Sequence, residues 1–184
     1  ILIVDGNEKA PSEIYQELGM DTQYEVYAKI LKKLSKNKIN VSIIHPAIDK
    51  NFIPKGLNLD EFDGIVWTGS LLNIYDYNSS ITRQIDLAKN LMERKNKIFG
   101  SCWGLQVCVT AAGGKVRKNP KGLEAVVAKN ITLNQNGIKH PMYNGKNKKF
   151  DAFCWHYDEV ETIPEKCSIL ASNSKSEIQA ISFK

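Results

Sequence analysis

Apolar residues fall into short runs along the first half of the chain, and each run ends in glycine or in polar residues. The runs lie at residues 1–4, 40–46, 64–70 and 97–101. Short apolar runs bounded by turn residues are typical of strands that are buried on both faces of a sheet. The pattern therefore predicts four buried strands in this half of the chain.

A helical period separates these runs. From Asp21 to Leu34 the apolar residues recur at steps of three and four positions, and the same period extends over residues 80–94. A third helical stretch, residues 103–112, ends at two consecutive glycines, which are common helix terminators. Strands that alternate with amphipathic helices predict an α/β fold, with a mainly parallel sheet between two layers of helices.

The second half has a different pattern. Residues 125–134 alternate and are rich in β-branched side chains, residues 137–149 are typical of a loop or hairpin, and residues 167–172 and 177–183 are strand-like without helices between them. We expect these strands to be antiparallel additions to the parallel sheet. No repeat, low-complexity tract or linker marks a boundary, so residues 1–184 are predicted to form a single domain.

Charge and composition exclude some partners. The chain of 184 residues has 25 basic and 20 acidic residues, a net charge of +5. Lys146, Lys148 and Lys149 form the one basic cluster, and because no aromatic or arginine residue is interleaved with it, we interpret it as a solvated loop rather than a nucleic-acid site. No apolar run approaches the ~18 residues that span a bilayer. The first residues are strand-like and do not resemble a leader, so we expect a cytoplasmic protein without membrane partners.

Four cysteines are the next candidates for chemistry. Cys102, Cys108, Cys154 and Cys167 match no zinc or Cys-x-x-Cys spacing, and the sequence predicts no metal site. A cysteine taken alone is most simply a small buried apolar residue. Only Cys102 has neighbours that indicate another role.

Cys102 stands where a predicted strand changes into a predicted helix, with Gly100 two positions before it and Gly104 two positions after it. In parallel α/β sheets such turns face the ligand-binding edge. Glycines at this spacing permit the sharp turn of a nucleophile elbow, here with sulfur in place of oxygen. The helix amino terminus stabilises a thiolate. The pattern predicts a cysteine nucleophile.

The segment GSCWGLQ, residues 100–106, resembles the G-x-C-x-G-x-Q signature of the class I glutamine amidotransferases, within them the stand-alone members that are similar to GMP synthase. Three further segments resemble the family in the same order: residues 67–76, residues 111–125 and the segment CWHYDEV at 154–160. The resemblance implies a flavodoxin-like, three-layer α/β/α fold. It also implies a glutaminase, in which Cys102 attacks the side-chain amide of glutamine, forms a γ-glutamyl thioester and releases ammonia to an acceptor, without a cofactor.

The resemblance also assigns roles to other residues. The oxyanion hole would use the backbone amide of Trp103 and one from the turn Gly69-Ser70. Ser70 stands where many members have glycine, and it fits the turn if its φ is negative. Gln106, one helical turn after Cys102, would hold the polar end of the substrate. The segment Trp155, His156, Tyr157 and Asp158 would line the pocket for the α-amino and α-carboxylate groups, and a synthetase or synthase partner would handle the acceptor.

Each assignment has a structural alternative. Gly69 and Ser70 could simply end a strand, Gln106 could be an exposed helix residue, Trp155 could be a core or pocket-wall residue, and His156 could be a structural histidine. His45 and His140 each precede a proline and are predicted to be loop residues without partners.

One departure from the family concerns the base. Members supply a histidine and its orienting carboxylate from a His-Pro-Glu segment after the final strands, and this sequence contains no such triplet. The simplest interpretation is a chain that lacks its last few tens of residues, and the alternative is a chain that never had them. We therefore expect weak or absent glutaminase activity. If turnover is robust, His156 is the candidate base.

Two other functions stay open at this point. The chain could hydrolyse another γ-glutamyl compound, or it could be a binding relative without turnover. A flavodoxin-like cofactor site is not predicted, because Asn7, Glu8 and Lys9 place an acidic group where a phosphate would lie.

Overall fold

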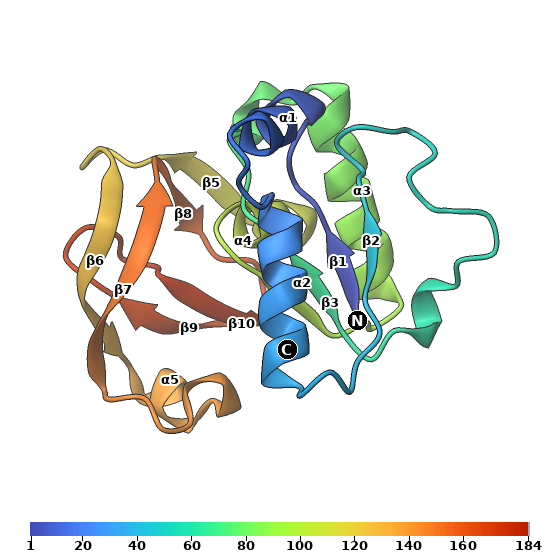
Figure 1. Cartoon of the computed structure of the whole chain (residues 1–184). Coiled ribbons are helices and arrows are strands. Elements are labelled where there is room, and N and C mark those ends of the chain that lie inside the picture. The colour runs from blue at the N-terminus through green and yellow to red at the C-terminus, as the bar shows by residue number, and fades with distance from the viewer. Residues whose placement is uncertain (184) are drawn as a thin grey trace. The chain divides into compact units, whose positions relative to one another are not determined.

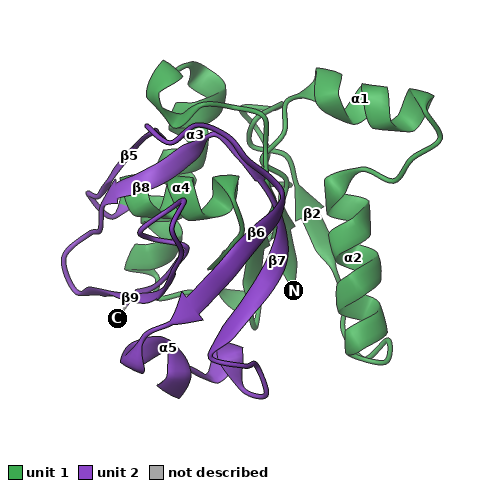
Figure 2. Ribbon diagram, turned by 90° about the vertical axis from the view of Figure 1, so that its left-hand side faces the viewer, with its two compact units in different colours: residues 1–111 green, residues 112–184 purple. Residues whose placement is uncertain are grey.

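The structure, a computed structural model, describes residues 1–183 and divides into two compact units. Figure 1 shows the chain with its elements labelled, and Figure 2 colours the units, Ile1–Ala111 and Ala112–Lys184. A single domain over residues 1–184 stays a prediction.

The first unit is built on a parallel sheet. Its strands are β1 (Leu2–Val4), β2 (Ser42–Ile44), β3 (Ile65–Trp67) and β4 (Ile98–Gly100), in the spatial order β2-β1-β3-β4. The four strands confirm the four apolar runs of the sequence. All three residues of β1 are fully buried, as expected for a central strand covered on both faces.

Helices cover both faces of this sheet. The helices of this unit are α1 (Lys9–Glu17), which buries no residue, α2 (Gln23–Leu34), α3 (Ser79–Glu93) and α4 (Trp103–Ala111), with short 3₁₀ turns at Leu59–Glu61 and Ile74–Asp76. The connections β1-α2-β2 and β3-α3-β4 step in opposite directions across the sheet, and right-handed crossovers then place α2 and α3 on opposite faces (Figures 1 and 2). The predicted three layers are confirmed. None of the helices within residues 1–183 is both long and apolar enough to cross a membrane.

The helix borders follow from local chemistry. Thr22 begins α2 with a capping box, in which the Thr22 amide donates to the Glu25 carboxylate at 2.8 Å and the Glu25 amide donates to the Thr22 hydroxyl at 3.4 Å. Helix α1 was not predicted, because its nine residues contain only two large apolar side chains, Ile14 and Tyr15, too few to show a repeat over several turns.

The second unit is antiparallel. Strands β6 (Glu124–Leu133), β7 (Lys149–His156), β9 (Cys167–Ser172) and β10 (Ala180–Phe183) form one sheet in the order β10-β9-β6-β7, and β5 (Lys115–Lys118) pairs with β8 (Asp158–Thr162). The predicted antiparallel strands are confirmed, but within the described residues they pair with one another and form sheets of their own. The expected loop at 137–149 contains part of a short helix, α5 (Gln135–Lys139), and the 3₁₀ turn Pro141–Tyr143.

A buried glutamine joins the elements around the elbow in the first unit. The indole N–H groups of Trp67 and Trp103 both donate to Gln84 Oε1, at 3.1 and 2.8 Å. Gln84 Nε2 donates in turn to the carbonyl oxygens of Gly6 and Ser80, at 3.3 and 3.2 Å. All three large side chains are buried and satisfied, so α3, β3 and the start of α4 are fixed to one another.

We predict that Gly104→Ala lowers the free energy of unfolding by about 1–3 kcal/mol. A Cβ atom at Gly104 would lie 2.7 Å from Trp67 Cβ and 2.9 Å from the Trp67 carbonyl oxygen. Alanine favours a helix over glycine, so a loss of stability would come from this overlap. Urea unfolding measures the change.

Gly64→Ala is the matched control, because its Cβ would meet Ile1 Cδ1 at an ordinary 3.4 Å. Equal unfolding midpoints for the two variants would contradict the close approach of α4 to β3.

Candidate active site

Cys102 lies in the turn between β4 and α4. Its φ is +51°, in the left-handed region that residues with a side chain rarely adopt. The Gln106 amide donates to the Cys102 carbonyl oxygen at 3.2 Å, so α4 starts directly after the cysteine. The Cys102 side chain is exposed, and the sharp strand-to-helix turn expected from the sequence is present.

Two glycines make this turn sterically possible. A Cβ atom at Gly100 would lie 2.5 Å from the carbonyl carbon of Gly104, well inside contact distance. The end of β4 and the first turn of α4 therefore touch through backbone atoms alone. This contact leaves Cys102 at the amino end of α4, where the helix dipole and the first amide groups favour an anion.

The loop after β3 adjoins the elbow. A Cβ atom at Gly69 would lie 3.8 Å from Cys102 Cβ, so the structure brings Gly69 beside the cysteine. Ser70 is not among the described residues with positive φ, which meets the condition set for serine at this position. Its hydroxyl accepts a hydrogen bond from the Leu72 amide at 3.2 Å. The oxyanion role of Gly69 and Ser70 stays a prediction.

Trp103 and Gln106 project from α4 into buried surroundings. The Trp103 side chain belongs to the core, which leaves its backbone amide as the group relevant to an oxyanion. Gln106 is 7% exposed, and its Oε1 has no hydrogen-bond partner among residues 1–183. An exposed helix position for Gln106 is therefore wrong. A buried acceptor without a donor is costly, and a ligand N–H would satisfy it.

The predicted substrate segment lies in the second unit, at the turn from β7 to β8. Side chains alternate along β7, so Trp155 and Tyr157 are exposed at 61% and 52%, while His156 and Asp158 point to the other side and are more buried. A core position for Trp155 is thus wrong. Trp103, Gly69, Ser70, Gln106 and Cys102 all belong to the first unit, and residues 155–158 belong to the second.

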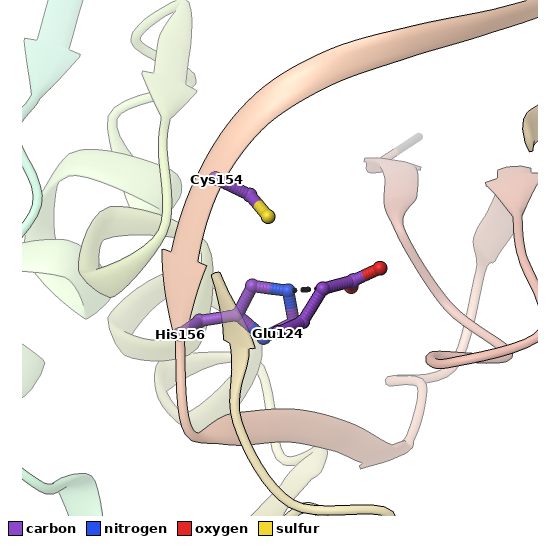
Figure 3. Close-up of side chains that lie close together, drawn as sticks. All are labelled: Glu124, Cys154 and His156. Carbon is purple, nitrogen blue, oxygen red and sulfur yellow. Dashed lines mark hydrogen bonds and ion pairs between the residues drawn. The ribbon is translucent and has the colours of Figure 1, made fainter. Parts of the chain in front are cut away.

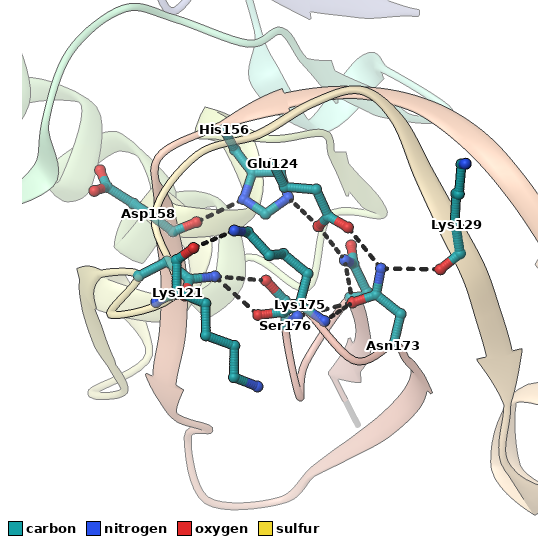
Figure 4. Close-up of polar contacts among 10 residues, drawn as sticks. Lys121, Glu124, Lys129, His156, Asp158, Asn173, Lys175 and Ser176 are labelled. Atoms are coloured by element: carbon teal, nitrogen blue, oxygen red, sulfur yellow. Dashed lines mark hydrogen bonds and ion pairs between the residues drawn. The ribbon is translucent and has the colours of Figure 1, made fainter.

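His156 has both ring nitrogens in contact with oxygen atoms. Nδ1 lies 2.8 Å from the Asp158 carbonyl oxygen and Nε2 lies 3.0 Å from Glu124 Oε2 (Figures 3 and 4). A carbonyl oxygen can only accept, so Nδ1 donates to it, and Nε2 is engaged by the Glu124 carboxylate. Both ring nitrogens are therefore engaged by residues of the second unit. The geometry favours the structural interpretation of His156.

Glu124 is the centre of a polar cluster, shown in Figure 4. Its buried carboxylate also accepts hydrogen bonds from Asn173 Nδ2 at 2.6 Å and from Gln179 Nε2 at 2.7 Å. Asn173 Oδ1 accepts from the backbone amide of Ser176 at 2.8 Å. The cluster therefore fastens the start of β6, the end of β7 and the loop between β9 and β10 to one another.

The same cluster holds a set of possible metal ligands. Donor atoms of Glu124, Cys154 and His156 lie within 4.8 Å of one another (Figure 3), and all three are zinc ligand types. The spacing of the cysteines along the sequence does not reveal this set, because the pairing of β6 with β7 brings the three residues together. Burial, followed by the charge of Glu124, raises the pKa of the Cys154 thiol, and His156 and Glu124 already contact each other at 3.0 Å. A metal ion would have to displace the thiol proton and break this contact.

The other two histidines have partners that the sequence analysis did not expect. His45 Nδ1 lies 3.1 Å from the buried Asp5 carboxylate, and the ring packs edge-on against Tyr24 at 5.0 Å between centroids. His140 Nδ1 accepts from the Met142 amide at 3.2 Å at the start of a 3₁₀ turn. Both are loop residues, as predicted, and both have partners that the sequence alone does not show.

An open cavity of about 550 Å³ lies elsewhere in the first unit, between α3 and residues 50–59. Arg83 lines it, but its guanidinium is already bound to the carbonyl oxygens of Pro46 and Ala47 at 2.8 and 2.9 Å. Since this cavity contains none of the cysteines, we place the candidate chemistry at Cys102 instead.

The sequence around this site is similar to that of known proteins. The family model described as glutamine amidotransferase class-I matches residues 19–184. A gamma-glutamyl-L-1-hydroxyisopropylamide hydrolase of Pseudomonas sp. is 33% identical over 187 residues, which covers 100% of this chain and 62% of the relative. A glutamine-hydrolyzing GMP synthase from Methanosphaera stadtmanae is 26% identical in one of its subunits over 145 residues, covering 79% of this chain and 74% of the relative.

A solved structure shows the same fold. The glutamine amidotransferase from Methylobacillus flagellatus superposes with a TM-score of 0.71 at 16% identity, covering 100% of this chain and 65% of the other. The flavodoxin-like arrangement predicted from the resemblance is confirmed. The chain spans 62% of the length of the Pseudomonas relative.

We predict that Cys102 is alkylated by iodoacetamide at neutral pH well before the other cysteines. Burial raises the pKa of Cys108 to about 12 and also raises the pKa of Cys167, so both remain protonated thiols. Cys102 is exposed at a helix amino terminus. Mass spectrometry of the digested chain measures each rate, with Cys102→Ser as the control. Equal labelling of Cys102 and Cys154 would contradict this prediction.

We also predict that Glu124→Gln lowers the free energy of unfolding by about 2 kcal/mol. The amide N–H₂ of the new side chain would face donors of Asn173 or Gln179 that the carboxylate now accepts. Glu165→Gln, at an exposed position, is the control and should change little. Denaturant unfolding measures both, and equal stabilities would mean that the cluster does not hold the second unit together.

Proposed function

Because the chain belongs to the class I glutamine amidotransferase family, we propose that Cys102 attacks the side-chain carbonyl carbon of a γ-glutamyl amide. The sulfur–carbon bond forms, the carbon–nitrogen bond breaks, and the nitrogen takes up the proton that the thiol gives up and leaves as an amine. Water then cleaves the γ-glutamyl thioester to glutamate and restores the thiol. The observation that carries this proposal is the exposed Cys102 at φ +51°, between the end of β4 and the start of α4.

The elbow also supplies a means to stabilise charge. Attack on the amide creates an oxyanion, and each well-aimed donor to it is worth ~3 kcal/mol. The Trp103 amide is in the first turn of α4, where amides have no partner within the helix. The Ser70 amide belongs to the loop that adjoins Cys102. We assign these two amides to the oxyanion hole.

Gln106 is assigned to the α-ammonium end of the substrate by its hydrogen-bonding capacity. Gln106 Oε1 is buried without a donor, and the α-ammonium group of a γ-glutamyl compound would supply one. Trp155, Tyr157 and Asp158, at the turn from β7 to β8 of the second unit, remain proposed substrate-binding residues, and His156 holds that turn through its bond to the Asp158 carbonyl oxygen.

The relatives support the proposed substrate class. The Pseudomonas relative covers all of this chain and is named as a hydrolase of a γ-glutamyl amide, which supports hydrolysis of an N-substituted γ-glutamyl amide rather than of glutamine. The second candidate is a glutaminase that passes ammonia to a synthase partner, which the family model and the GMP synthase relative favour. In either reaction Cys102 must stay reduced, so we assign the protein to a reducing compartment such as the cytoplasm.

We predict that this chain releases glutamate from γ-glutamyl ethylamide faster than from glutamine, at a rate that drops to background in Cys102→Ser. Cys108→Ser is the control and keeps the rate, because Cys108 is buried in α4. Glutamate release, measured enzymatically, checks both points. A rate that survives Cys102→Ser would contradict the nucleophile. Faster release from glutamine would favour the second candidate.

A further inference from the structure

A buried carboxylate lies at the end of β1. Asp5 has no exposed surface, and its Oδ1 accepts hydrogen bonds from the backbone amide and the side-chain amide of Asn7, both at 3.2 Å. His45 lies against the other oxygen at 3.1 Å. A buried carboxylate must be hydrogen-bonded. The two hydrogen bonds that Asn7 donates to Asp5 also fix the position of Asn7.

Asn7 and Thr68 converge on a single carbonyl group. Asn7 Nδ2 donates to the Gly69 carbonyl oxygen at 3.3 Å, and the Thr68 hydroxyl donates to it at 2.9 Å. Thr68 is held in turn by the Gly6 amide, which donates to its hydroxyl at 2.9 Å. Asn7 and Thr68 are buried, at 3% and 0% exposure, so water does not compete for these bonds.

The anchored carbonyl determines where the next amide points. In a planar trans peptide the carbonyl group and the following N–H are antiparallel, so a Gly69 oxygen held by Asn7 and Thr68 directs the Ser70 N–H away from them. Among the hydrogen bonds of residues 1–183, none is donated by the Ser70 amide. Gly69 itself lies beside Cys102, because a Cβ atom on Gly69 would be 3.8 Å from Cys102 Cβ.

We infer that Asn7 and Thr68, supported by Asp5, are positioning residues that aim the Ser70 amide at the oxyanion formed on Cys102. This inference rests on the proposed function. If the Gly69–Ser70 peptide turned over, its carbonyl oxygen would face the oxyanion and repel it. The bonds to the Gly69 oxygen oppose that rotation.

The test separates a step that forms an oxyanion from one that does not. Acylation of Cys102 by a γ-glutamyl p-nitrophenyl ester passes through an oxyanion, whereas its alkylation by iodoacetamide displaces iodide without one. In Thr68→Val we expect acylation to slow by about 10- to 100-fold, with alkylation unchanged within about twofold. Thr68→Ser keeps the hydroxyl and should recover most of the acylation rate.

Asn7→Ala provides a second variant, since it removes the other donor to the Gly69 oxygen and should slow acylation in the same selective way. The matched control is Asn73→Ala, whose side chain bonds to Asp76 at 3.2 Å further along the same loop. Equal acylation rates in wild type, Thr68→Val and Asn7→Ala, or equal slowing of both reactions, would overturn the inference alone. A wild-type chain that the ester does not acylate at Cys102 would overturn the proposed function and this inference with it.

Discussion

The arrangement of the first unit depends on a contact between backbone atoms, where α4 begins against the ends of β3 and β4. Side chains at Gly100 and Gly104 would place Cβ atoms 2.5 and 2.7 Å from neighbouring heavy atoms. Because glycine lets the helix start so close to the sheet, the single residue between strand and helix takes a left-handed φ and its thiol is exposed. The neighbouring Trp103 is buried instead and completes the core through Gln84.

Each unit also contains a buried carboxylate at a strand end. Asp5 follows β1 and organises Asn7, Thr68 and His45, and Glu124 begins β6 and organises its partners on β7 and on the loop before β10. The carboxylates of both clusters accept hydrogen bonds from side chains of the same unit. They act by fixing the backbone, which is the physical reason to regard His156 as a holding residue and not as the base.

The sequence predicted those parts of the first unit in which apolar residues form a continuous run or a helical repeat over several turns. Four apolar runs became β1 to β4, and periodic segments became α2, α3 and α4. Strand β7 was not predicted, because its exposed side includes Phe153 and Trp155, so apolar and polar residues do not alternate in its sequence.

Helix α1 was not predicted either, because it is short and Ile14 and Tyr15 are its only large apolar side chains. At the site, the glycine spacing was enough to find the elbow at Cys102. Two of the contacts join residues far apart in the chain: the bond from Asn7 to Gly69 and the contact between His156 and Glu124. No local sequence pattern predicts them. A polar residue directly after a fully buried strand, as at Asp5, was the one available signal.

The central claim is that Cys102 becomes covalently bonded to a γ-glutamyl group. The most direct measurement is rapid acid quenching of the chain mixed with γ-glutamyl ethylamide, followed by digestion and peptide mass spectrometry. The account predicts a γ-glutamyl mass on the peptide that contains Cys102 and on no other cysteine peptide. An adduct on Cys154 or Cys167, or glutamate release without any adduct on Cys102, would contradict it.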